Sequence, residues 1–106
     1  MLTEPKALQV SIYTHEDRVA GILDFLFKQK IAGAIAVRAY AGFGSRHHMH
    51  TTSLVELAPD PPVIVRFLDK RSRVEAILPQ VAKLAHGGLI TTHEVDVYLT
   101  AENLPL

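Results

Sequence analysis

The hydrophobic residues of this chain change spacing twice along its length, from every second position to helical spacing and back. Apolar and polar residues alternate from Leu8 to Thr14, which is the period-2 pattern of a strand. Helical spacing follows to about Lys30, and Thr14 with Asp17 resembles a capping arrangement at the helix start. This change of period predicts a strand followed by a helix.

The middle of the chain predicts two more strands with a loop between them. Alternation over 34–41 predicts a strand, and a loop opens after it at Gly42. Residues 51–57 are a short strand or the returning arm of that loop, and the proline-rich stretch 58–62 is a turn or an extended link. The β-branched and aromatic run 63–68 predicts the third main strand.

The last third predicts a second helix and a fourth main strand. Asp69 is the expected N-cap of this helix, whose apolar residues recur at helical spacing. Pro79 lies inside it and is expected to kink it or break its hydrogen bonds. Gly87 and Gly88 end the helix, and alternation over 89–99 predicts the fourth strand.

The resulting order, β-α-β-β-α-β, is that of a ferredoxin-like α+β sandwich, an antiparallel sheet with both helices on one face. With 106 residues and 48% hydrophobic residues, the chain is expected to form a single domain, residues 1–106, around one core.

The sheet face turned away from the helices is predicted to be rich in tyrosine and arginine, which are enriched where protein surfaces meet. This pattern favours self-association through the sheet, with a hydrated face as the alternative. The residues assigned to this face are Ser11, Tyr13, Arg38, Tyr40, Arg66, Glu94, Asp96 and Tyr98.

Composition excludes several classes of partner and site. Eleven Lys and Arg balance eleven Asp and Glu, which argues against nucleic acid or an anionic membrane as partner. The chain has no cysteine, so disulfides and thiolate chemistry are excluded. It has neither an apolar signal segment nor a run long enough for a membrane span, and we expect a soluble, cytoplasmic protein without membrane insertion.

The run from Gly42 to His50 combines glycines, which let a backbone approach a ligand closely, with arginine and histidine. Four sequence blocks then place this run in a family context: 33–44, 62–69, 74–79 and 87–91. In this order they resemble the PII-like signalling proteins, most closely the small uncharacterised branch known as a domain of unknown function.

This resemblance implies a homotrimer whose sheets face the three-fold axis, with a mobile T-loop rooted at residues 42–44. It also implies a small effector bound between subunits, at the T-loop base of one chain and the loop before the last strand of another. Backbone N–H groups and a nearby arginine suit an anion. The ligand-binding residues expected on this basis are Arg38, Gly42, Phe43, Gly44, Ser45, Arg46, Arg66, Gly87 and Gly88.

Departures from the nucleotide-binding PII proteins narrow the expected effector. The loop before the last strand carries no phosphate-binding lysine over 86–89, and 99–104 has none of the arginines that hold polyphosphate in those proteins. AMP, ADP or an anion such as bicarbonate is therefore expected rather than ATP. The T-loop also has no tyrosine for uridylylation.

A different class of function would use the loop histidines. His47, His48 and His50 are candidate ligands of a divalent metal, and a trimeric metal-binding protein similar to CutA is the alternative. The sequence contains no nucleophile triad and no phosphate-cradling Gly-Lys motif, so it gives no indication of an enzyme. The main hypothesis is a regulator that controls a partner protein, a transporter or metabolic enzyme, through T-loop order.

Overall fold

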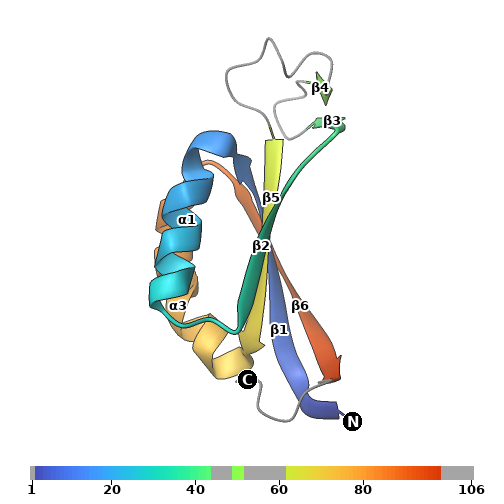
Figure 1. Ribbon diagram of the computed structural model, residues 1–106, viewed down its shortest axis with the longest axis vertical. Coiled ribbons are helices and arrows are strands. Elements are labelled where there is room, and N and C mark those ends of the chain that lie inside the picture. Colours follow the sequence, from blue (N-terminus) through green and yellow to red (C-terminus); the bar gives the residue numbers. More distant parts are fainter. Residues whose placement is uncertain (1, 44–48, 52–61, 99–106) are drawn as a thin grey trace.

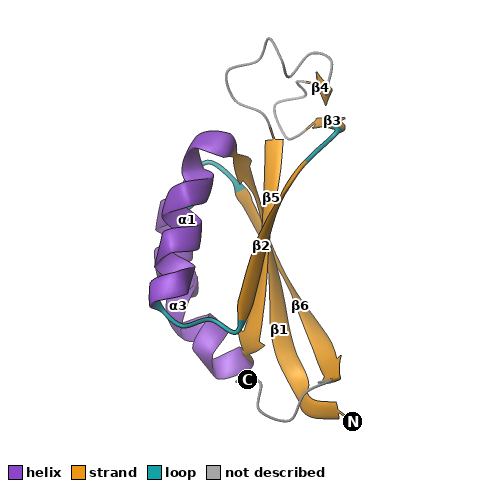
Figure 2. Cartoon of the chain, viewed as in Figure 1, coloured by secondary structure: helices purple, strands orange, loops and turns teal. Residues whose placement is uncertain are grey.

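The computed structural model describes residues 2–43, 49–51 and 62–98. Two helices lie side by side on one face of a four-stranded sheet, and within these described residues the other face carries no helix (Figures 1 and 2). The elements are β1 (Leu2–His15), α1 (Glu16–Lys28), β2 (Gly33–Arg38), β3 (Ala41–Phe43), β4 (Met49–Thr51), β5 (Pro62–Lys70), α3 (Arg71–Leu84) and β6 (Leu89–Tyr98).

The main sheet has the strand order β2-β5-β1-β6, and each neighbouring pair is antiparallel. The ferredoxin-like α+β prediction is therefore confirmed. The short strands β3 and β4 form a separate two-stranded hairpin beyond the end of β2 (Figure 1). Because β2 and β6 are the two edge strands, the loops that the sequence singled out lie on opposite edges of the sheet.

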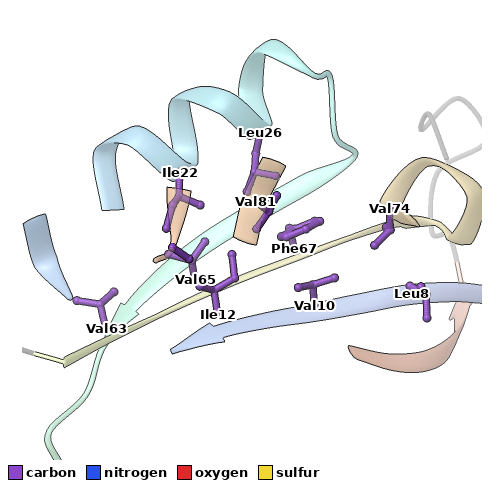
Figure 3. Packing of buried hydrophobic residues seen from close by; sticks show 11 residues of the cluster. Leu8, Val10, Ile12, Ile22, Leu26, Val63, Val65, Phe67, Val74 and Val81 are labelled. Carbon is purple, nitrogen blue, oxygen red and sulfur yellow. The ribbon is translucent and has the colours of Figure 1, made fainter. Parts of the chain in front are cut away.

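The core lies between the sheet and the two helices (Figure 3). Alternate residues of β1 and β5 point toward the helices because successive side chains of a strand face opposite sides. They pack against the buried stripe of each helix, which follows from helical spacing. The large buried residues are Leu8, Val10 and Ile12 of β1, Val63, Val65 and Phe67 of β5, Ile22 and Leu26 of α1, and Val74 and Val81 of α3.

Both predicted helix caps are wrong. The N-cap of α1 is His15 and that of α3 is Lys70, and neither makes a side-chain capping hydrogen bond. Thr14 is buried as a residue of β1, and Asp69 is the penultimate residue of β5. In both places the strand runs up to the residue immediately before the helix, so Thr14 and Asp69 lie within strands and not at the helix starts.

The helix α3 runs from Arg71 to Leu84 with Pro79 inside it, so the predicted second helix is confirmed. Proline removes one N–H from the helical ladder and leaves the carbonyl four residues earlier without its usual donor. Both Pro79 and Glu75 are exposed, so water can reach that carbonyl.

The predicted helix-free face is wrong for both edge strands. Arg38 lies opposite buried Val63, on the helix side, and forms an ion pair with Glu16 at the start of α1. Glu94 lies opposite buried Leu8 and forms an ion pair with Arg71 at the start of α3. Strand alternation then puts Asp96 and Tyr98 on the side of Glu94. Tyr40 follows the end of β2 and belongs to neither face of that strand.

Candidate functional site

The two loops implicated by the sequence lie at the same end of the sheet. Val37 at the end of β2 lies opposite Ile64 of β5. Tyr13 of β1 is paired with Ile64 on one side and with Leu89, the first residue of β6, on the other. The chain that leads from β2 into β3 and the loop that precedes β6 therefore lie at one level of the sheet.

Within one chain these loops are far apart, because β2 and β6 are opposite edges of the sheet. Three spacings of about 4.8 Å separate the edges, which amounts to roughly 14 Å. An anion as small as bicarbonate cannot contact both at once. A small-anion site that uses both loops therefore needs the β2 edge of one copy beside the β6 edge of another.

The loop between α3 and β6 depends on its glycines for its shape. Gly87 has a φ of 88°, a conformation that residues with a Cβ rarely adopt. The Gly88 N–H donates to the carbonyl of Ala85 at 2.8 Å. A Cβ on Gly88 would lie 2.5 Å from the backbone oxygen of Tyr13. Both glycines are thus required for the turn that brings the helix end back onto β1, whether or not a ligand is bound.

Replacing Gly88 by alanine is expected to destabilise the protein by about 1–3 kcal/mol, because the new methyl group meets backbone that has little room to move. Urea unfolding measures the change. Gly21→Ala is the matched control, since nothing lies within 4 Å of a Cβ there and alanine favours the helix. Equal stability of the two variants would contradict the packing described for Gly88.

Of the predicted ligand arginines, the two that the structure describes, Arg38 and Arg66, are not brought together. Arg38 faces the helices and is paired with Glu16, whereas Arg66 lies on the helix-free face in the middle of the sheet. The Arg66 Nε donates to Ser11 Oγ at 3.1 Å. One small anion cannot use both arginines of the same chain, so they cannot belong to a single site formed by one copy.

The T-loop residues are only partly within the described structure. Gly42 and Phe43 lie in β3, and the hairpin places Gly42 opposite His50 of β4. Gly44, Ser45, Arg46, His47 and His48 lie outside the described residues. Within residues 2–43, 49–51 and 62–98 no group of three or more His, Asp or Glu side chains could hold a metal ion. The histidine hypothesis stays a prediction.

Sequence reasoning missed the role of Asp69, which is fully buried. Its Oδ2 accepts the Ala32 N–H at 3.0 Å and lies 3.2 Å from the guanidinium of Arg73. Arg73 in turn donates to the carbonyl of Gln29 at 2.5 Å. This network holds the α1–β2 loop against the start of α3. The only signal in the sequence was an aspartate at the end of an apolar run, which also suits a helix cap.

A hollow of about 450 Å³ lies beside the same α1–β2 loop. It is lined by apolar groups and lies at the start of β2. The two glycine loops, namely the segment at Gly42 after β2 and the α3–β6 loop with Gly87 and Gly88, lie at the other end of the sheet. Its lining offers no charged side chain, so it is unsuited to an anionic effector. The lining residues are Leu23, Leu26, Phe27, Ile31, Ala32, Gly33 and Ala34.

Charged pairs fix the helix side of the sheet. Hydrogen bonds from Arg71 to Glu75 and Glu94 raise the pKa of the Arg71 guanidinium above its ordinary value. The pair with Glu94 joins α3 to β6. Among the residues that the structure describes, neither helix has the length and hydropathy that a transmembrane helix needs.

Comparison with known proteins gives the same fold. The UPF0166 protein of Aquifex aeolicus (strain VF5) is 30% identical over 76 residues, which are 72% of this chain and 71% of that protein. CPII, a nitrogen regulatory PII-like protein from Thiomonas intermedia K12 solved with ADP, AMP and bicarbonate, matches with a TM-score of 0.72. Its identity is 20%, and the match covers 92% of each chain.

CutA1 from Oryza sativa has a similar fold at 8% identity, with a TM-score of 0.62 over 92% of this chain and 85% of that one. The family model DUF190, described as "Uncharacterized ACR", matches residues 7–97. The resemblance predicted from the four sequence blocks is thereby confirmed. The chain belongs to the DUF190 family, and its fold is that of the PII-like proteins.

Proposed function

We propose that this protein is a PII-like regulator, without catalytic activity, that binds a small anionic effector between copies of itself. One observation carries the proposal: the two glycine loops lie at the same end of the sheet but on opposite edges. Only an assembly brings them together around one small ligand. The likeness to CPII, which was solved with ADP, AMP and bicarbonate, supports the choice of effector.

Self-association is supported by the helix-free face of the sheet. A row of apolar side chains crosses it at the end near the glycine loops, one from each strand: Val37, Ile64, Tyr13 and Leu89. The exposed fractions of Val37, Tyr13 and Leu89 in the single chain are 49%, 42% and 61%. Contiguous apolar surface of this kind is typical of an interface. The homotrimer implied by the PII-like resemblance would cover it.

The effector is proposed to be AMP, ADP or bicarbonate, because the α3–β6 loop has no lysine for a third phosphate. Binding at the root of the T-loop, residues 42–44, would order that loop and change its contacts with a partner protein. We propose a transporter or metabolic enzyme as that partner and the cytoplasm as the location. The regulatory step is a shift between loop arrangements that the effector biases.

Calorimetric titration of the assembled protein with AMP, ADP, ATP and bicarbonate tests the effector. We expect saturable heat with AMP, ADP or bicarbonate, and at least tenfold weaker binding of ATP. The absence of heat with all four ligands would overturn the proposal. Lys28→Met, a change at an exposed position at the end of α1, near the start of β2 and away from both loops, should bind as the wild type does.

Mixed assemblies test whether the site lies between copies. Ala41→Asp and His86→Asp each add a carboxylate at an exposed position beside one of the two loops, where it repels an anion. Each variant alone is expected to lose effector binding. Random co-assembly of equal amounts should restore roughly a quarter of the sites, because some interfaces then combine two unaltered loops. If mixing restores nothing, the two loops do not form one intermolecular site.

A further inference from the structure

A polar group interrupts the apolar surface of the helix-free sheet face, one row below the apolar row. Arg66 of β5 lies opposite Ser11 of β1, and Ser11 lies opposite Thr91 of β6. In the next row Gln9 lies opposite His93. Directly opposed residues of neighbouring antiparallel strands have Cβ atoms about 5 Å apart on one face. A guanidinium and two hydroxyl groups are therefore side by side in the middle of the face.

Arg66 differs from the other arginines of the sheet and of α3. Arg38, Arg71 and Arg73 each form an ion pair with a carboxylate. Within the described part of the chain, Arg66 has no carboxylate partner, and its Nε donates to the neutral Ser11 hydroxyl. Arg66 lacks a carboxylate partner on β6 because Glu94 and Asp96 lie on the opposite face of the sheet.

If another copy covers this face, the guanidinium of Arg66 loses water, and its unpaired charge destabilises the assembly. Removing a guanidinium from water without a counter-charge is strongly unfavourable, and a negative partner with well-placed hydrogen bonds offsets much of that penalty. The apolar row favours contact with another copy, and Arg66, already half-buried, lies in the adjacent row. The interface therefore needs a negative group at Arg66, and within the described part of the chain the rows of this face at and next to Arg66 include no Asp or Glu.

We propose that Arg66, Ser11 and Thr91 form a second anion site, which takes a small oxyanion such as bicarbonate, phosphate or sulfate. The guanidinium can hold an oxyanion through two parallel hydrogen bonds. Ser11 Oγ accepts from Arg66 Nε, so its own O–H is available to donate to the anion, as is the exposed Thr91 hydroxyl. This inference rests on the proposed self-association, but the site is distinct from the effector site at the sheet end.

The test compares wild type, Arg66→Met and the control Lys83→Met, a change at an exposed position of α3, during titration with sodium sulfate, which is not among the effectors proposed for the sheet end. Ionic strength is held constant with sodium chloride, and both heat and melting temperature are recorded. We expect saturable binding to wild type and to Lys83→Met, and at least a tenfold loss of affinity in Arg66→Met. Ser11→Ala should weaken binding by a smaller factor, because it removes one donor and leaves the charge.

Melting temperatures in buffer without added oxyanion identify the source of the counter-charge. If the anion comes from solution, Arg66→Met should raise the melting temperature there, and the difference should shrink or reverse when sulfate is added. A lower melting temperature of Arg66→Met in every buffer, with no sulfate effect on wild type, would overturn the inference and indicate a carboxylate from another copy. So would equal oxyanion affinity in all variants.

The proposed oxyanion site and the proposed effector site can be confirmed or contradicted independently of each other. Loss of effector binding in both loop variants tests the sheet end, and Arg66→Met should leave AMP or ADP binding within about twofold of wild type. A monomeric wild type would remove the proposed self-association. Loss of oxyanion binding in Arg66→Met alone reports on the second site.

Discussion

The double substitution Val37→Lys with Leu89→Lys is expected to reduce the protein from an assembly to single chains of 11.7 kDa. Both residues belong to the apolar row of the helix-free face, and each is about half exposed in the single chain. A lysine held in an interface without a partner costs several kcal/mol. Lysine is preferred to aspartate because an aspartate on this face could pair with Arg66.

Sedimentation velocity measures the mass, and circular dichroism checks that the variant remains folded. Ala20→Lys with Ala82→Lys is the matched control, since it adds two charges at exposed helix positions. The control should keep the mass of the wild-type assembly. A double variant that sediments as the wild type does would show that the helix-free face is not the interface.

Replacing Asp69 by alanine is expected to destabilise the fold by about 3 kcal/mol. The carboxylate accepts the N–H groups of Ala32 and Lys70, and it faces the guanidinium of Arg73. Leaving a part-buried donor without an acceptor costs up to roughly 1–3 kcal/mol for each group. The α1–β2 loop loses its attachment to α3, so it should also become more accessible to hydrogen exchange.

Urea unfolding gives the change in free energy, and hydrogen exchange at Ala32 locates it. Asp24→Ala is the control, because Asp24 forms an exposed pair with Lys28 at 3.0 Å. Pairs of this kind contribute less than about 1 kcal/mol. If Asp69→Ala were no more destabilising than Asp24→Ala, the buried network would not hold the loop.

Much of the fold could be predicted because the spacing of apolar residues within each segment indicates its secondary structure. The change from period 2 to helical spacing located the four main strands and both helices, and Gly87 marked the end of the second helix as predicted. The extra length of β1 and the hairpin of β3 and β4 were not predicted. Pairing with partner strands extends an element beyond its own apolar pattern, and that pairing is not visible in a local window.

The candidate site was predicted in its parts but not in its arrangement. The glycine loops were found from composition and from the family resemblance, and they do lie at one end of the sheet. Arg38 and Arg66 were grouped because both are cationic, yet strand pairing puts them on opposite faces. Asp69 carries a signal that fits either a helix cap or a buried acceptor, so only its surroundings decide its role.

The sequence by itself determined the element order, the α+β class and the family. Only the tertiary structure decided which face each strand presents to the helices. Alternation divides a strand into two sides but does not say which side is inner, and the usual assumption turns the apolar side inward. The pairing of β2 with β5 and of β6 with β1 instead turns Val37 and Leu89 outward and Arg38 and Glu94 toward the helices. The reason is that register is fixed by contacts between distant segments, and it leaves an exposed apolar row on the helix-free face while the helices cover the other face.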